Sequence, residues 1–274
     1  VAHRAPWDFR VSLYTWTKGI ASGAYLVPAL LLLGGLIEPG SALWRWAAPA
    51  LGGGFLAATV GLLILDLTHP ERFYLVLTRP QWRSWLARGG VILSLYGAVL
   101  VLHFLAALLG RTGWPQALVW AGLPLAVLCA IYTAWLFAQA RARDLWQSPL
   151  LPPQLLVQAT ASGAAALLVA AASLDPAAVG PLAQITALAT LVHLLLVAGE
   201  ATITHPTAHA RLAAHEMTRG RYRLFFRTGM ALQALGLVAA LALPTGVLTA
   251  PFVLAGLLAY EHAFVQAGQA VPLA

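Results

Sequence analysis

The sequence contains eight apolar stretches that are each long enough to cross a lipid bilayer. A bilayer core of about 30 Å requires about 20 apolar residues in an α-helix. Polar and charged loops, or clusters of proline and glycine, separate these stretches. We therefore predict an all-α integral membrane protein with eight transmembrane helices. The predicted spans are residues 12–36, 47–67, 86–110, 115–139, 151–174, 179–203, 225–243 and 247–266.

The composition excludes a water-soluble fold. Of the 274 residues, 60% are hydrophobic and only 9% are charged, whereas a soluble domain carries about 25% charged residues. No cleavable signal peptide is visible, so we expect the first span to act as its own insertion signal. The tight turn at Pro244, Thr245 and Gly246 separates the last two spans. Without that turn the number of helices would fall to seven, and the C-terminus would change sides.

The positive charge is gathered on one side of the predicted membrane. With eight spans, both termini and the loops after the second, fourth and sixth spans share a side. The positive-inside rule places this side in the cytoplasm, although a docked partner would explain the same asymmetry. The opposite side has only Arg45 and Arg111. The basic side contains 14 of the 16 Lys and Arg residues: Arg4, Arg10, Lys18, Arg72, Arg79, Arg83, Arg88, Arg141, Arg143, Arg211, Arg219, Arg221, Arg223 and Arg227.

Ionisable side chains inside the predicted spans are candidates for chemistry, because burying them in lipid is costly. Lys18 either snorkels to the basic interface or donates a hydrogen bond to a ligand. Asp66 and Arg72 read as a helix cap and an ion pair, or as part of a site. Tyr132 is either an interfacial anchor or a donor to a quinone carbonyl. Glu200, Glu261 and His262 are solvated or paired groups, or members of a proton relay.

The sequence argues against a metal or haem centre in this chain. Cys129 is the single cysteine, whereas an iron–sulfur cluster needs about four. His103 and His193 lie about 22 Å and about 15 Å from the basic ends of their helices, which is a poor match for two ligands of one iron. The basic residues flank membrane spans, which excludes a nucleic-acid surface, and no phosphate-binding loop, zinc spacing or nucleophile elbow is present.

Several segments resemble the NrfD/PsrC family of membrane subunits. They are Leu13-Tyr14-Thr15-Trp16-Thr17-Lys18-Gly19-Ile20-Ala21-Ser22-Gly23, Asp66-Leu67-Thr68-His69-Pro70-Glu71-Arg72-Phe73 followed by Ser84-Trp85, Tyr132 to Arg143-Asp144-Leu145-Trp146-Gln147, and Ala267-Gly268-Gln269-Ala270-Val271-Pro272-Leu273. Their order and the number of spans match the family over nearly the whole chain.

The resemblance implies one polytopic domain over residues 1–274, built from two four-helix bundles at about 12–140 and about 150–266. It implies a quinone-binding subunit, in a bacterial inner membrane, of a multi-subunit oxidoreductase complex. Its quinone would be menaquinone or ubiquinone, not covalently bound, with no haem or iron–sulfur cluster in this chain. Its partner would be a ferredoxin-like iron–sulfur subunit, accompanied by a molybdopterin or cytochrome subunit. The quinone pocket would lie at the N-terminal end of the first helix, with Tyr132 as the family's quinone-contacting tyrosine.

From these considerations we predict three groups of site residues. The quinone-binding group is Trp16, Lys18, His69, Arg72, Trp85 and Tyr132, and the proton-transfer group is Asp66, His193 and Glu200. The partner-docking group is Arg79, Arg83, Arg141, Arg143 and Arg221.

The sequence departs from the polysulfide reductase branch at two positions. Where that branch has an asparagine and a histidine in the first helix, this chain has Lys18 and Ala21. A polysulfide substrate is therefore in doubt. That branch also holds its catalytic subunits outside the cell, which conflicts with the positive-inside orientation.

Two alternatives to a quinone-binding redox subunit stay open. One is a transporter or proton-translocating subunit without direct redox chemistry, for which acidic residues at the membrane midplane would argue. The other combines both functions, with Glu200 and His193 forming a proton path coupled to quinone chemistry.

Overall fold

A computed structural model describes residues 7–67, 69–111, 113–203, 205–242 and 246–272. In this part of the chain the secondary structure is entirely helical. Arg4, Pro244 and Thr245, which entered the predictions above, lie outside the described residues. Gly246, at the end of the expected turn, has a positive φ of 59°, a conformation that suits glycine.

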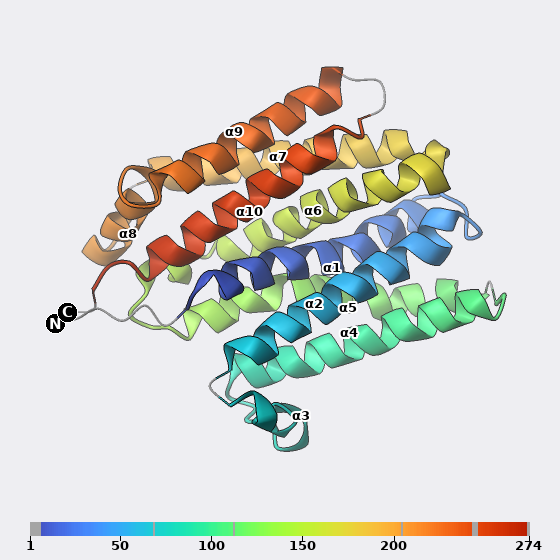
Figure 1. Cartoon of the computed structure of the whole chain (residues 1–274), viewed down its shortest axis with the longest axis horizontal. Coiled ribbons are helices and arrows are strands. Elements are labelled where there is room, and N and C mark those ends of the chain that lie inside the picture. Colours follow the sequence, from blue (N-terminus) through green and yellow to red (C-terminus); the bar gives the residue numbers. More distant parts are fainter. Residues whose placement is uncertain (1–6, 68, 112, 204, 243–245, 273–274) are drawn as a thin grey trace.

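The described residues form eight long helices that run side by side along the molecule (Figure 1). Their ends agree with the predicted spans to within about three residues. They are α1 (Phe9–Leu33), α2 (Ala48–Asp66, preceded by the π-helical turn Leu43–Ala47), α4 (Trp85–Leu108), α5 (Gly113–Ala138), α6 (Leu151–Leu174), α7 (Val179–Thr202), α9 (Arg223–Ala242) and α10 (Thr249–Gly268).

Seven of the long helices are apolar and long enough to span a membrane, judged by length and composition. The eighth, α10, has 20 residues, as α9 does, but it carries Glu261 and His262 and is largely buried against α1, α6 and α9. Its lower hydropathy therefore reflects contact with other helices in place of lipid. The chain is a multi-pass membrane protein, as the sequence predicts.

The packing divides the long helices into two groups. α1, α2, α4 and α5 contact one another and are called here the first helix group. α6, α7, α9 and α10 form the second helix group. α1 joins the groups by packing on α6 and α10. At the crossing of α1 and α6, a Cβ on Gly23 would lie 1.8 Å from the carbonyl oxygen of Ala159, so the two backbones touch.

Two of the expected loops contain short helices. The loop after α2 includes a 3₁₀ turn at Pro70–Arg72 and α3 (Leu75–Thr78), and the loop after α7 includes α8 (Ala208–Thr218). The Thr207 side chain caps α8 by accepting a hydrogen bond from the backbone N–H of Ala210. Ala210, Ala213 and Met217 are buried at helical spacing, so α8 lies against the end of the bundle.

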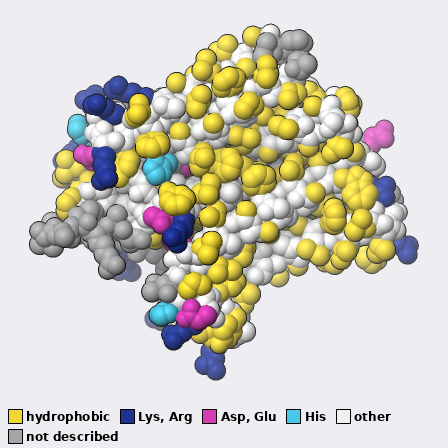
Figure 2. Space-filling model, viewed as in Figure 1, with side chains coloured by type: hydrophobic (Ala, Val, Ile, Leu, Met, Phe, Trp, Pro, Cys, Tyr) yellow, Lys and Arg dark blue, Asp and Glu magenta, His cyan; other side chains and the backbone are white. Residues whose placement is uncertain are grey.

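The short helices α3 and α8 lie at the same end of the bundle (Figure 1). Most Lys and Arg side chains that are visible in Figure 2 gather at this end, which is called here the basic end. The two described ends of the chain also meet there, because the backbone N–H of Trp7 donates to Gln269 Oε1 at 3.1 Å. This arrangement matches the one-sided charge expected for an even number of spans.

Candidate functional site: a cavity at the basic end

A cavity of about 250 Å³ lies among α1, α2, α4 and α5 at the basic end. Its residues come from the first two turns of α1, the last turns of α2 and α5, and the first turn of α4. Most of them are apolar, with Tyr14, Asp66 and Arg10 as the polar members. The lining residues are Trp7, Arg10, Val11, Tyr14, Leu62, Leu63, Asp66, Leu67, Leu86, Leu136 and Phe137.

A pair of tyrosine hydroxyls forms the inner polar wall of this cavity. The hydroxyl of Tyr14, which lines the cavity, is hydrogen-bonded to the hydroxyl of Tyr132 on α5. Both side chains are buried, with exposed fractions of 3% and 1%. The Tyr14 hydroxyl also lies 3.4 Å from Thr133 Oγ1. Two hydroxyls carry two hydrogens but use only one between them, so the pair can offer the other to a ligand.

The outer polar wall combines a carboxylate with an arginine. Asp66 ends α2 and lines the cavity. Arg10 Nη1 donates to the backbone carbonyl of Leu65 at 2.7 Å, and its Nε lies 3.3 Å from Asp8 Oδ2. The carboxylate of Asp66 therefore stands at the mouth of the cavity, beside a group with fixed positive charge.

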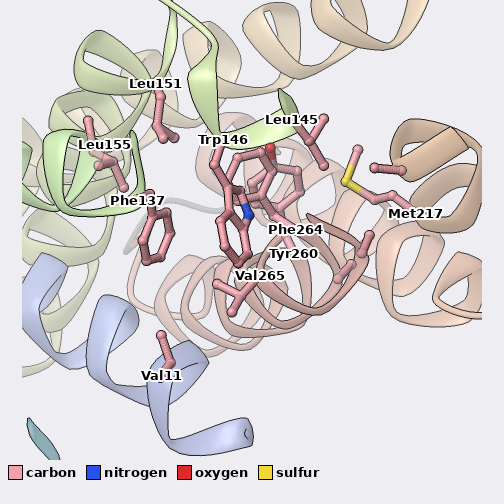
Figure 3. Packing of buried hydrophobic residues seen from close by; sticks show 14 of the residues in the cluster. Val11, Phe137, Leu145, Trp146, Leu151, Leu155, Met217, Tyr260, Phe264 and Val265 are labelled. Atoms are coloured by element: carbon pink, nitrogen blue, oxygen red, sulfur yellow. The ribbon is translucent and has the colours of Figure 1, made fainter. Parts of the chain in front are cut away.

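An aromatic cluster supports the side of the cavity that faces the second helix group. Trp7 stacks on Trp146 with ring centroids 4.7 Å apart, and Phe137 lies 5.2 Å from both rings. Figure 3 shows Trp146 among side chains from α1, α5, α6 and α10, including Val11 and Phe137, which line the cavity. This packing holds two of the cavity's aromatic walls in place.

The position of the Tyr132 ring depends on a glycine. A Cβ added to Gly89 on α4 would lie 2.3 Å from the Tyr132 ring. The absence of a side chain at Gly89 therefore makes room for Tyr132 to reach Tyr14.

The structure brings two of the predicted site residues to this cavity. Asp66 lines it, and Tyr132 stands directly behind Tyr14. Trp85 instead stacks on Trp135 at 5.0 Å and lies under the Arg88 guanidinium. The other two predicted residues of the α2–α4 loop are exposed, because His69 and Arg72 both lie beside Glu71 on the surface.

Lys18 and Trp16 point away from the cavity. The Lys18 ammonium donates to the backbone carbonyls of Cys129 and Ala130, and its Nζ lies 5.4 Å from the centre of the Tyr132 ring. Lys18 is 1% exposed, so it does not snorkel to the surface. Trp16 Nε1 donates to the carbonyl of Leu254 on α10 at 2.9 Å. Both residues therefore hold α1 to its neighbouring helices.

His193 and Glu200 lie in the second helix group, on the buried face of α7. His193 hydrogen-bonds to Gln158 and Gln233, with ring-nitrogen distances of 3.0 Å and 2.6 Å. His103 belongs to the first helix group and packs against Trp44, with ring centroids 4.5 Å apart. Among the described residues, no group of three or more His, Cys, Asp and Glu side chains is placed to hold a metal ion.

Four of the five predicted docking arginines are exposed: Arg79, Arg83, Arg141 and Arg221. The fifth, Arg143, is only 6% exposed. Its Nη1 donates to the carbonyls of Gln269 and Val271 at 3.0 Å and 2.8 Å, and burial lowers the pKa of its guanidinium. Arg143 therefore ties the C-terminal segment to the η3 turn (Asp144–Gln147), and its guanidinium is used within the chain.

The sequence reasoning did not select Trp7, Arg10, Tyr14 or Phe137 for the site. Tyr14 is in the first of the family-like segments and lies one turn before Lys18, so a signal was present. The face of α1 that each residue occupies depends on how the helix is rotated, which the segment alone does not reveal. Trp7 and Arg10 precede the predicted start of the first span.

The comparison with known families decides the identity of the fold. The family model described as "Polysulphide reductase, NrfD" matches residues 1–273. The chain belongs to the NrfD family.

Three curated relatives agree with the NrfD assignment. "Protein NrfD" of Escherichia coli (strain K12) is 30% identical over 61% of this chain and 59% of its own length. A Halobacterium salinarum protein named as a dimethyl sulfoxide reductase membrane subunit is 34% identical over 40% of this chain and 30% of its own length. "Protein NrfD homolog" of Haemophilus influenzae is 25% identical over 58% of this chain and 57% of its own length. The chain thus spans less than two thirds of each of these relatives.

Proposed function

We propose that this NrfD-family chain is the quinone-binding membrane subunit of a multi-subunit redox complex. In this proposal it passes electrons between a membrane quinone and an iron–sulfur partner. The observation that carries the proposal is the Tyr14–Tyr132 hydroxyl pair in the wall of a cavity that also contains Asp66. The family resemblance led to the same class of ligand from the sequence.

The cavity suits the ring of a quinone. Its volume of about 250 Å³ is somewhat below the range of about 300–1,000 Å³ for pockets that hold whole drug-sized ligands, as expected for a ring whose chain stays outside. Trp7 and Phe137 supply flat apolar walls. A larger hollow of about 660 Å³ between α2 and α4 is lined by apolar side chains and glycine, so it offers no side-chain donor for a carbonyl oxygen.

The polar residues have distinct proposed roles. Tyr14 donates its free hydroxyl hydrogen to one quinone oxygen, and Tyr132 orients Tyr14. Asp66 exchanges a proton with water at the basic end. The bound quinone would supply two-electron, two-proton chemistry, so a proton donor and acceptor at the cavity mouth is required.

The exposed arginines at the basic end form the proposed docking surface for the partner. Arg79, Arg83, Arg141 and Arg221 would attract an acidic face of a ferredoxin-like iron–sulfur subunit. One matched relative is named as a membrane subunit of a reductase, which supports a multi-subunit assembly. A molybdopterin or cytochrome subunit would complete it. We place the complex in a bacterial inner membrane, with the basic end in the cytoplasm by the positive-inside rule.

Quinol-linked electron transfer by the assembled complex tests this proposal. Asp66→Asn and Tyr14→Phe should each lower kcat at least about tenfold, since positioned proton transfer contributes about 10²–10⁴-fold to rates. His69→Gln is the matched control, because His69 follows Asp66 closely in the chain but is exposed on the surface. It should retain activity within about twofold. Wild-type turnover in both Asp66→Asn and Tyr14→Phe would contradict the proposal.

A further inference from the structure

A second set of buried polar side chains connects the two helix groups at the depth of Lys18. Lys18 on α1 and Glu261 on α10 are 1% and 4% exposed, and both line the same small void. Gln158 of α6 lines this void as well. Buried charges in a membrane protein need partners, and these two have opposite sign.

The void has room for one water molecule. Its volume is about 10 Å³, and a site of about 10–15 Å³ holds a water when two to four polar groups surround it. Lys18, Gln158, Ser162 and Glu261 are the polar side chains that line it closely, and they come from α1, α6 and α10. Gln158 Oε1 is buried and has no hydrogen-bond partner, so a water here would satisfy it.

The hydrogen bonds around His193 fix which ring nitrogen carries the proton. The Gln233 amide nitrogen donates to the carbonyl of Gly229 at 3.2 Å, which leaves Gln233 Oε1 as an acceptor. His193 Nδ1 must therefore donate to Gln233 Oε1, at 2.6 Å. His193 Nε2 then accepts from the Gln158 amide nitrogen at 3.0 Å. Gln158 thus has its amide nitrogen toward His193 and its unsatisfied oxygen free for the void.

We propose that Lys18, Glu261, one water in the void and His193 form a proton relay between the two helix groups, with Gln158 as its gate. A proton that reaches His193 Nε2 turns this atom from an acceptor into a donor. The Gln158 amide must then rotate by about 180° to present Oε1 to Nε2. The water that gives up the proton regains one from the Lys18–Glu261 pair, so protons balance and no electron moves.

The relay begins beside the quinone cavity. Lys18 Nζ lies 5.4 Å from the ring of Tyr132, whose hydroxyl is bonded to Tyr14. The claim that the relay serves quinone chemistry rests on the proposed function. The relay itself rests only on the buried side chains and the void. Other titratable groups that face it are Tyr132 and Cys129 on α5, Glu200 on α7 and Tyr260 on α10.

Infrared difference spectra of the purified full chain, recorded during a pH titration in H₂O and in D₂O, test the relay without quinone. The carboxyl stretch of protonated Glu261 is identified by its loss in Glu261→Gln. We expect Gln158→Met and His193→Gln to shift this band, because each breaks the link between the water and His193. His103→Gln is the control, since His103 is equally buried but belongs to the first helix group. An unshifted band in both variants, or no Glu261 carboxyl band at any pH, would overturn the relay.

Turnover of the assembled complex gives the second readout. Glu261→Gln should lower kcat for quinol at least about tenfold, leave KM within about twofold and raise the solvent isotope effect. Glu261→Asp should restore part of kcat. Wild-type kcat and isotope effect in Glu261→Gln would show that the relay does not serve the quinone. A wild-type complex that does not turn over quinol would instead contradict the proposed function, while the infrared result still decides the relay.

Discussion

The hydroxyl of Tyr14 on α1 is hydrogen-bonded to the hydroxyl of Tyr132 on α5, although 118 positions separate the two residues in the chain. This bond joins the start of the first helix to the fourth long helix. It also places the family-like tyrosine behind the residue that faces the cavity. The proposed function depends on this pair more than on any other contact.

Replacing Tyr132 by phenylalanine should impair quinol turnover while leaving the fold intact. The variant leaves the buried Tyr14 hydroxyl without its main partner, which costs about 1–3 kcal/mol and frees Tyr14 to rotate toward Thr133. We expect kcat of the assembled complex to fall about tenfold. The midpoint of thermal unfolding in detergent should drop only slightly. Unchanged turnover would count heavily against the assignment of the cavity.

Gly89→Ala should have the same functional effect by a different route. The added Cβ would lie 2.3 Å from the Tyr132 ring and must displace it from Tyr14. Gly54→Ala is a matched control, because a Cβ at Gly54 meets nothing within 4 Å. We expect quinol turnover to fall in Gly89→Ala and to stay at the wild-type level in Gly54→Ala. Equal activity in the two variants would show that the ring position does not matter.

Gly23→Ala should destabilise the contact between α1 and α6. Its Cβ would lie 1.8 Å from the Ala159 carbonyl oxygen, and the helix backbones would have to separate. Overpacking of this kind costs about 1–3 kcal/mol. Thermal unfolding monitored by circular dichroism should show a lower midpoint than that of Gly53→Ala, whose added methyl group enters open space. If the two midpoints coincide, the backbones do not approach as closely as described.

Arg143→Ala and Arg141→Ala should separate a structural arginine from a docking one. Arg143→Ala leaves the carbonyls of Gln269 and Val271 without their donor, at about 1–3 kcal/mol for each buried group. It should lower the unfolding midpoint. Arg141 is exposed, so Arg141→Ala should leave stability unchanged and weaken binding of the partner, most visibly at low salt. The opposite pattern in a melting assay and a pull-down would refute both assignments.

The sequence was sufficient to predict the helices but only part of the site. Apolar length is a one-dimensional property, so the prediction of residues 151–174 matches α6 at both ends. α8 was predicted as a loop because it is amphipathic and too short to span a membrane. Asp66 could be selected because a charge at the end of an apolar helix stands out in the sequence.

The remaining site residues depend on tertiary packing. Lys18 is on the helix face that meets α5 and α10, whereas Tyr14, one turn earlier, faces the cavity. A small rotation of α1 would exchange these environments, and no local pattern sets that rotation. The contacts of Gly23 with Ala159 and of Gly89 with Tyr132 are among those that set it, and both join segments far apart in the chain.

Photoaffinity labelling tests the central claim most directly. The assembled complex would be irradiated with a photoreactive quinone that carries the reactive group on its ring, and labelled peptides would be identified by mass spectrometry. We predict saturable labelling of the first turns of α1 and the last turns of α2, around Val11 and Leu62, that excess natural quinone abolishes. Labelling confined to the hollow between α2 and α4 around Leu100, or labelling that natural quinone does not compete, would contradict the proposed site.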